Sequence, residues 1–161
     1  MAIVEIPKIK AGDEIINSNP KIFEDVKAKP GEKALICMHT VPFEGSVGLI
    51  NMLQSTRLVR KGYDTTLLLY GPGVLMAAAT RGFPKVADEA FPGNQSFNNQ
   101  IKTILKEGGK VLACRFALSA LYGFREADLI EGVQVIHPHD VLDCILEHHR
   151  ANAVILDTWT V

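Results

Sequence analysis

The sequence is poor in cysteine and has no long apolar run. Its three cysteines, Cys37, Cys114 and Cys144, are widely spaced and form no CxxC motif, which argues against a disulfide framework and a structural zinc site. No apolar stretch approaches the roughly 20 residues of a membrane-spanning helix. The first residues lack the basic start and long apolar centre of a signal peptide. We therefore expect a cytoplasmic protein that does not enter a membrane.

An excess of charge of one sign is absent as well. The 161 residues include 17 basic and 18 acidic side chains, for a net charge of −1. Nucleic-acid-binding domains usually carry a basic excess, so the composition argues against a nucleic-acid partner. Hydrophobic residues make up 47% of the chain, which is typical of a packed globular domain. The length suits one domain.

From residue 33 onward, apolar strands alternate with amphipathic helices. Strands are predicted at residues 34–38, 65–70, 111–113, 133–136 and 153–156, and longer helices at 46–61, 97–105 and 141–150. A short helix is also expected at 74–80 and another at 116–122. The alternation predicts an α/β fold with a mainly parallel five-stranded sheet and helices on both faces. Residues 1–32, interrupted by proline and glycine, are predicted to be an N-terminal arm, and residues 33–161 the α/β domain.

Residues able to do chemistry follow the ends of the predicted strands. In a parallel sheet these ends share one edge, where α/β proteins usually bind ligands. The residues that fall there are His39, Tyr70, Cys114, His137 and Asp157. The sequence therefore predicts one edge that carries a thiol and imidazoles.

Cys114 is the strongest candidate on this edge. It ends a short apolar strand and precedes a predicted helix, and Arg115 follows it. A helix start and a guanidinium both favour the reactive thiolate, so Cys114 is a candidate nucleophile or sulfur carrier. The alternative is a small apolar residue buried in the core, as unpaired cysteines often are. Cys37 and Cys144 lie in apolar patterns and are predicted to be core residues.

The histidines allow more than one interpretation. His39 or His137 could assist proton movement at the thiol. Imidazole is also a common metal ligand, so His39, His137 and His139 form a candidate metal set. We favour the alternative in which His137 and His139 cap a helix or bond to backbone. We therefore assign no metal and no cofactor.

Short motifs in the second half of the chain resemble the DsrE/DsrF-like family. They are Gly109-Lys110-Val111-Leu112-Ala113-Cys114, then Ala117, Ala120 and Gly123, then Asp128-Leu129-Ile130-Glu131-Gly132-Val133. The resemblance extends over roughly residues 33 to 157. Three further segments are similar to a bacterial subgroup named for a nitrogen-starvation response and found near nitrilase genes. They are Gly62-Tyr63-Asp64-Thr65, Tyr70-Gly71-Pro72-Gly73 and Phe91-Pro92-Gly93-Asn94.

The resemblance implies a three-layer α/β/α sandwich that assembles as trimers or hexamers. It also implies a persulfide site at Cys114, because sulfur-relay members carry sulfur on the matching cysteine. Several relatives have a second cysteine three residues later, where this chain has Ala117. An internal CxxC-type disulfide is therefore excluded.

Two main hypotheses follow from these patterns. The first is a sulfur carrier that uses Cys114, with Arg115 stabilising the anion and a protein partner for the transfer. The second is a non-catalytic oligomeric protein, linked to the nitrogen-starvation response, that regulates or binds a small anion or metabolite. Its pocket would lie between subunits and be formed by the long 71–97 connection and the histidines of the sheet edge. A metal enzyme at the three histidines is a third and weaker hypothesis. An enzymatic activity is neither assigned nor excluded.

Overall fold

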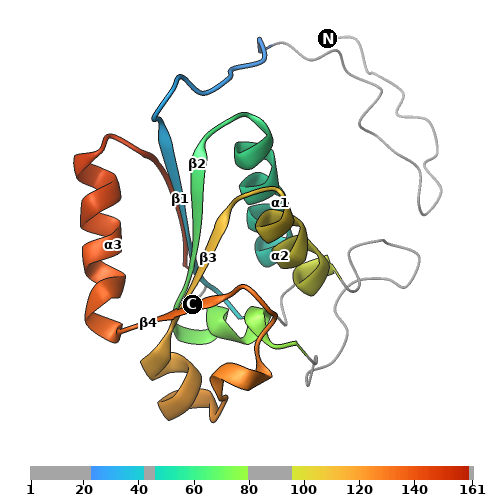
Figure 1. Cartoon of the computed structure of the whole chain (residues 1–161), viewed down its shortest axis with the longest axis vertical. Coiled ribbons are helices and arrows are strands. Elements are labelled where there is room, and N and C mark those ends of the chain that lie inside the picture. Colours follow the sequence, from blue (N-terminus) through green and yellow to red (C-terminus); the bar gives the residue numbers. More distant parts are fainter. Residues whose placement is uncertain (1–22, 42–45, 80–95, 160–161) are drawn as a thin grey trace, which may run out of the picture.

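The computed structural model describes residues 23–41, 46–79 and 96–159 (Figure 1). Its strands are β1 (Lys33–His39), β2 (Asp64–Leu69), β3 (Lys110–Cys114), β4 (Gln134–Ile136) and β5 (Val154–Trp159). They form one sheet in the order β4-β3-β2-β1-β5, and every neighbouring pair is parallel. The predicted five-stranded parallel sheet is confirmed.

The helices lie on both faces of this sheet. They are α1 (Ser46–Arg60), α2 (Ser96–Lys106) and α3 (Pro138–Arg150). In Figure 1, α1 and α2 cover one face and α3 lies against the other. This distribution follows from the strand order, because the crossovers from β1 to β3 and the crossover from β4 to β5 run in opposite directions along the sheet. None of the described helices is long and apolar enough to cross a membrane.

The larger hydrophobic core lies between the sheet and the α1–α2 layer. Alternate residues of the central strands, such as Ile36, Met38 and Leu67, are fully buried there. They meet Met52 of α1 and Ile101 of α2. The period of two along the strands and of about 3.6 along the helices places these apolar residues on facing surfaces.

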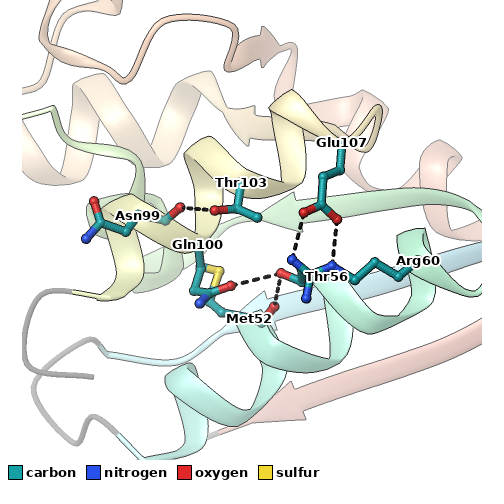
Figure 2. A network of polar contacts seen from close by, with 7 residues as sticks. All are labelled: Met52, Thr56, Arg60, Asn99, Gln100, Thr103 and Glu107. Carbon is teal, nitrogen blue, oxygen red and sulfur yellow. Dashed lines mark hydrogen bonds and ion pairs between the residues drawn. The ribbon is translucent and has the colours of Figure 1, made fainter. Parts of the chain in front are cut away.

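Polar contacts fix how α1 and α2 lie on each other (Figure 2). The buried hydroxyl of Thr56 hydrogen-bonds the Gln100 amide oxygen at 2.9 Å and the Met52 carbonyl oxygen at 3.1 Å. Nearer the helix ends, Arg60 donates two hydrogen bonds to the Glu107 carboxylate, at 2.7 and 2.8 Å. These contacts set the register of one helix along the other.

The opposite face carries a smaller core. Leu35, Cys37 and Leu68 are buried beneath α3, with Val141, Cys144 and Ile145 of the helix packed against them. The helix packs mainly on β1 and β5. Beside α3 lies a cleft of about 450 Å³, whose walls include residues of β2, β3 and β4. This second face is therefore only partly covered by helix.

Two short segments differ from the predicted helices. Residues Gly71–Ala77 form a 3₁₀ turn in place of the predicted helix at 74–80, and Ala117–Leu121 form a π-type turn within the predicted 116–122 segment. The first turn ends early because the Ala77 carbonyl accepts from the Ile130 amide at 2.9 Å and the Ala79 amide donates to the Asp128 carbonyl at 2.8 Å. Most of the predicted N-terminal arm lies outside the described residues. So does the 80–95 part of the long 71–97 connection, which includes Phe91-Pro92-Gly93-Asn94.

Candidate functional site

The carboxyl edge of the sheet brings the candidate residues into one row. Leu69 pairs with Ala113 and Cys114 pairs with Ile136. The Tyr70 amide donates to the Met38 carbonyl at 3.3 Å, which extends β2 by one residue beside β1. His39, Tyr70 and Cys114 thus occupy neighbouring positions on β1, β2 and β3. The predicted edge is present.

Cys114 is the last residue of β3 and leads directly into the helical turn 115–122. Its side chain is 6% exposed and belongs to the larger hydrophobic core, together with Ala117 and Leu118. Each of the two alternatives predicted for Cys114 therefore holds in part, because the thiol lies at the carboxyl edge of the sheet and is also buried. The turn that follows is of the π type, a geometry found frequently at functional sites.

Arg115 points its guanidinium to a carboxylate. Its Nη2 lies 2.7 Å from Oε1 of Glu126, and both side chains are more than half exposed. The positive charge of Arg115, which the sequence analysis expected to stabilise the Cys114 thiolate, is therefore paired with Glu126. An exposed pair of this kind contributes little to stability.

The other two thiols lie on the α3 face. Cys37 is 1% exposed, and burial, the Asp157 carboxylate and Cys144 raise its pKa to about 12. Burial, and then Glu147, raises the pKa of Cys144. The prediction of a core position is confirmed for Cys37, whereas Cys144 is half-buried and lines the cleft. Both are disfavoured as nucleophiles because the thiolate is the reactive form.

A tyrosine–aspartate pair joins the row from the side of β5. The Tyr70 hydroxyl hydrogen-bonds Asp157, and burial together with that carboxylate raises the pKa of Tyr70 above its usual range. The His39 ring lies over Tyr70, with 4.8 Å between the ring centroids. Asp157 pairs in register with Cys37. These groups stand where the strand order reverses, at β1 and β5, a usual place for ligand sites in α/β sheets.

Sequence reasoning placed Tyr70 and Asp157 on this edge but gave neither a role. The missing information is the direction of the tyrosine side chain, which reaches past β1 to β5. The signal that was available is the position of both residues just at the ends of predicted strands, although β5 extends to Trp159 and Asp157 lies within it, in register with Cys37. A half-buried hydroxyl beside a carboxylate follows only from the packing.

His137 caps α3. Its Nδ1 accepts a hydrogen bond from the His139 amide at 3.3 Å, and its own amide donates to Asp140 Oδ2 at 3.2 Å. The rings of His137 and His139 meet edge to face at 4.8 Å. The capping alternative is therefore confirmed for His137.

The candidate metal set is not assembled. Among the residues that the structure describes, no three His, Cys, Asp or Glu side chains converge in a way that could hold a metal ion. His39 lies against Tyr70, whereas His137 and His139 stand at the start of α3. The third hypothesis thus loses its geometric basis.

Comparison with known proteins identifies the architecture. No family model and no curated protein matches the sequence. Among solved structures, the ychN protein from E. coli is similar with a TM-score of 0.61 and 15% identity, over 79% of this chain and 99% of that one. The protein of unknown function MTH1491 from Methanobacterium thermoautotrophicum is similar with a TM-score of 0.59 and 16% identity, over 79% and 100%. The chain has the DsrE-like fold.

In the DsrE-like fold of this chain, the carboxyl edge and the α3 face present different chemistry. The edge holds the thiol of Cys114 and the Tyr70–Asp157 pair. The α3 face holds the mixed-charge cleft and the two disfavoured thiols. At the identities found, the solved structures establish the fold alone.

Proposed function

We propose that this DsrE-like protein carries sulfur as a persulfide on Cys114. The observation that supports this most directly is the position of Cys114, the last residue of β3, in one row with Tyr70 and His39 at the carboxyl edge. Cys37, by contrast, lies beneath α3 with a pKa raised to about 12. Of the three cysteines, Cys114 is the one placed where α/β sheets usually present chemistry.

The transfer step balances without an added oxidant. The Cys114 thiolate attacks the outer sulfur of a donor persulfide, R–S–SH. A new S–S bond forms on Cys114, the donor S–S bond breaks, and the donor leaves as R–S⁻. His39 or His137 takes up the proton that the Cys114 thiol loses. The Arg115 guanidinium, which pairs with Glu126 in the resting structure, would turn toward the persulfide anion.

Burial of the thiol adds a requirement to this proposal. Because only 6% of the Cys114 side chain is exposed, the donor must reach it through movement of the 115–122 turn. This turn combines α-type and π-type geometry and is shorter than a stable isolated helix. Local opening of such a segment requires less free energy than global unfolding.

Intact-mass analysis tests the carrier proposal. The protein is incubated with inorganic polysulfide and separated from the excess. We expect the mass to increase by one sulfur atom in the wild type and in Cys37→Ser and Cys144→Ser. Cys114→Ser should show no increase. If Cys114→Ser still gains sulfur to the wild-type extent, the carrier function is wrong.

A second candidate function is a non-catalytic regulatory or ligand-binding role linked to the nitrogen-starvation response. The cleft on the α3 face supports a ligand-binding role, because 450 Å³ lies within the usual range for small-molecule sites. It lies at a different place from the pocket expected at the 71–97 connection, since no described residue of that connection lines it. Lysines and carboxylates both line this cleft, among them Lys33, Lys110, Asp143 and Glu147. Cys114→Ser should then leave the cellular phenotype intact, and loss of the phenotype would count against this role.

The resemblance also supports two proposals about context. A cytoplasmic location agrees with the carrier function, because reducing surroundings keep the acceptor thiol free for the transfer. A homo-oligomer, trimeric or hexameric, is expected from the DsrE/DsrF-like resemblance. Sedimentation analysis of the purified chain would measure its state of assembly.

A further inference from the structure

The two edges of the sheet differ in length and protection. The edge strand β4 has three residues, whereas the edge strand β5 has six. Among the described residues, β5 pairs only with β1, so its outer backbone groups face no other strand. Edge strands are usually guarded by lysine, proline or a bulge. The β5 sequence Val-Ile-Leu-Asp-Thr-Trp contains no lysine and no proline, and its one charge, Asp157, hydrogen-bonds Tyr70.

Exposed apolar side chains border this unguarded edge. On α3, the side chains of Leu142 and Leu146 are 60% and 43% exposed and lie one turn apart. Val154 at the start of β5 is 39% exposed. Exposed apolar groups that gather beside unpaired backbone are a feature of protein–protein contacts.

The two leucines lie on one particular flank of α3. The helix turns Val141 and Ile145 toward the sheet. Its Asp143 and Glu147 line the cleft, which is bounded by β2, β3 and β4. At about 100° per residue, Leu142 and Leu146 fall on the opposite flank of the helix. Since α3 packs on β1 and β5, that flank is the one beside the free edge of the sheet.

We propose that this edge forms a two-fold interface between two copies of the chain. In it, β5 pairs with the β5 strand of the second copy and α3 packs against the second α3 through Leu142 and Leu146. A two-fold axis perpendicular to the sheet makes both pairs antiparallel. The same surface is then used on each side, as a two-fold contact requires.

Helix polarity and hydrogen bonding both select a second copy as the occupant. Asp140 and His148 line the cleft on the other flank of α3, so the polarity that reaches the interface is that of the helix backbone, positive at its first turn and negative at its last. The antiparallel arrangement brings each positive start beside a negative end, whereas a parallel one would bring like ends together. A second β5 also supplies the complementary amide and carbonyl groups along all six residues. This inference is independent of the chemistry at Cys114.

The state of assembly tests the interface directly. The wild-type chain, the double variant Leu142→Glu/Leu146→Glu and the control Leu121→Glu are compared by sedimentation velocity over a range of concentrations. Leu121 is a matched control because its side chain is 55% exposed and it lies outside α3 and β5. We expect the double variant to weaken two-fold association by at least about 100-fold, because each substitution enters the interface twice. The control should associate like the wild type, and circular dichroism should show that all three fold.

Hydrogen exchange locates the strand contact. In the assembled wild type, the outward amides of β5 should be protected, and that protection should fall on dilution and in Leu142→Glu/Leu146→Glu. A dimer or a hexamer with two-fold contacts agrees with the proposal. A monomeric or purely trimeric wild type would overturn it. Protection of β5 that persists in a dissociated monomer would overturn it as well, because another segment of the same chain would then cover the edge.

Discussion

The two faces of the sheet are built to different degrees of completeness. On one face, α1 and α2 together bury a large core and are joined by the Thr56–Gln100 and Arg60–Glu107 contacts. On the other, the single helix α3 covers a small core and leaves a cleft beside it. The same strands contribute to both faces, since their side chains alternate. The difference therefore arises from the number of crossovers on each side.

The two faces also differ in how many apolar side chains they leave exposed. The α1–α2 face has few exposed apolar side chains beyond Ile50, whereas α3 exposes both Leu142 and Leu146. Most of the stabilising burial is thus on the first face. The second face and its edge retain the surfaces that a ligand or a second copy can use.

The largest expected effect compares neighbouring leucines of β2. Leu67 points to the α1–α2 core and Leu68 to the α3 core, and both are fully buried. Leu67→Ala should lower the free energy of unfolding by about 4 kcal/mol, and Leu68→Ala by about 2 to 3 kcal/mol. The smaller loss on the α3 side is expected because a less enclosed site relaxes more easily. Urea denaturation measures both, and a larger loss for Leu68→Ala would reverse the comparison.

A second substitution tests how tightly the carboxyl edge is packed. A Cβ added to Gly73 would overlap the backbone oxygen of Met38, which cannot move without shifting β1. Gly73→Ala should therefore cost about 2 to 3 kcal/mol. Gly31→Ala is the matched control, because no atom lies within 4 Å of its added Cβ and only its φ of +85° is unfavourable. The control should lose about 1 kcal/mol, and equal losses in thermal unfolding would contradict the close approach at Gly73.

The sequence predicted the sheet better than the site. Every strand and long helix followed from apolar periodicity, which depends on burial and is local in the chain. The position of Cys114 at the end of β3 followed from the same pattern. The pairing of Arg115 with Glu126 and of Tyr70 with Asp157 did not. Side-chain direction depends on partners that only the folded chain brings near.

The turn at Gly71–Ala77 shows the same limit at the level of the backbone. Its small and apolar residues are typical of a short α-helix, but Gly71 adopts a φ of +50° and the chain then pairs with the 128–130 segment. That segment lies far along the sequence. Its hydrogen bonds therefore select a 3₁₀ turn that local propensity does not indicate.

A smaller effect is expected where α1 meets α2. Thr56→Val keeps the shape of the side chain and removes the hydroxyl that bonds Gln100. The Gln100 amide then loses a partner at a part-buried site, so the free energy of unfolding should fall by about 1 to 2 kcal/mol. Thr103→Val on α2 is the control, since its hydroxyl bonds only the Asn99 carbonyl in an exposed position. If both variants unfold at the same urea concentration, Thr56 does not join the two helices.

The smallest expected effect is a pH dependence that arises from the thiol beneath α3. The pKa of Cys37 is raised to about 12, first by burial and then by the Asp157 carboxylate and Cys144. In the unfolded chain a thiol titrates near its usual value of about 8.5. The folded state therefore keeps its full stability below about pH 8.5 and loses it as the pH rises toward 12.

Comparison of the wild type with Cys37→Ala isolates this contribution. The alanine variant has a small cavity that lowers stability equally at every pH, so the difference in slope is the measurement. By about pH 9 the wild type should have lost less than about 1 kcal/mol more than the variant, relative to neutral pH. Urea denaturation at several pH values provides the slopes. Parallel slopes up to pH 10 would mean that Cys37 titrates alike in both states, and that α3 covers the second face less fully than its packing indicates.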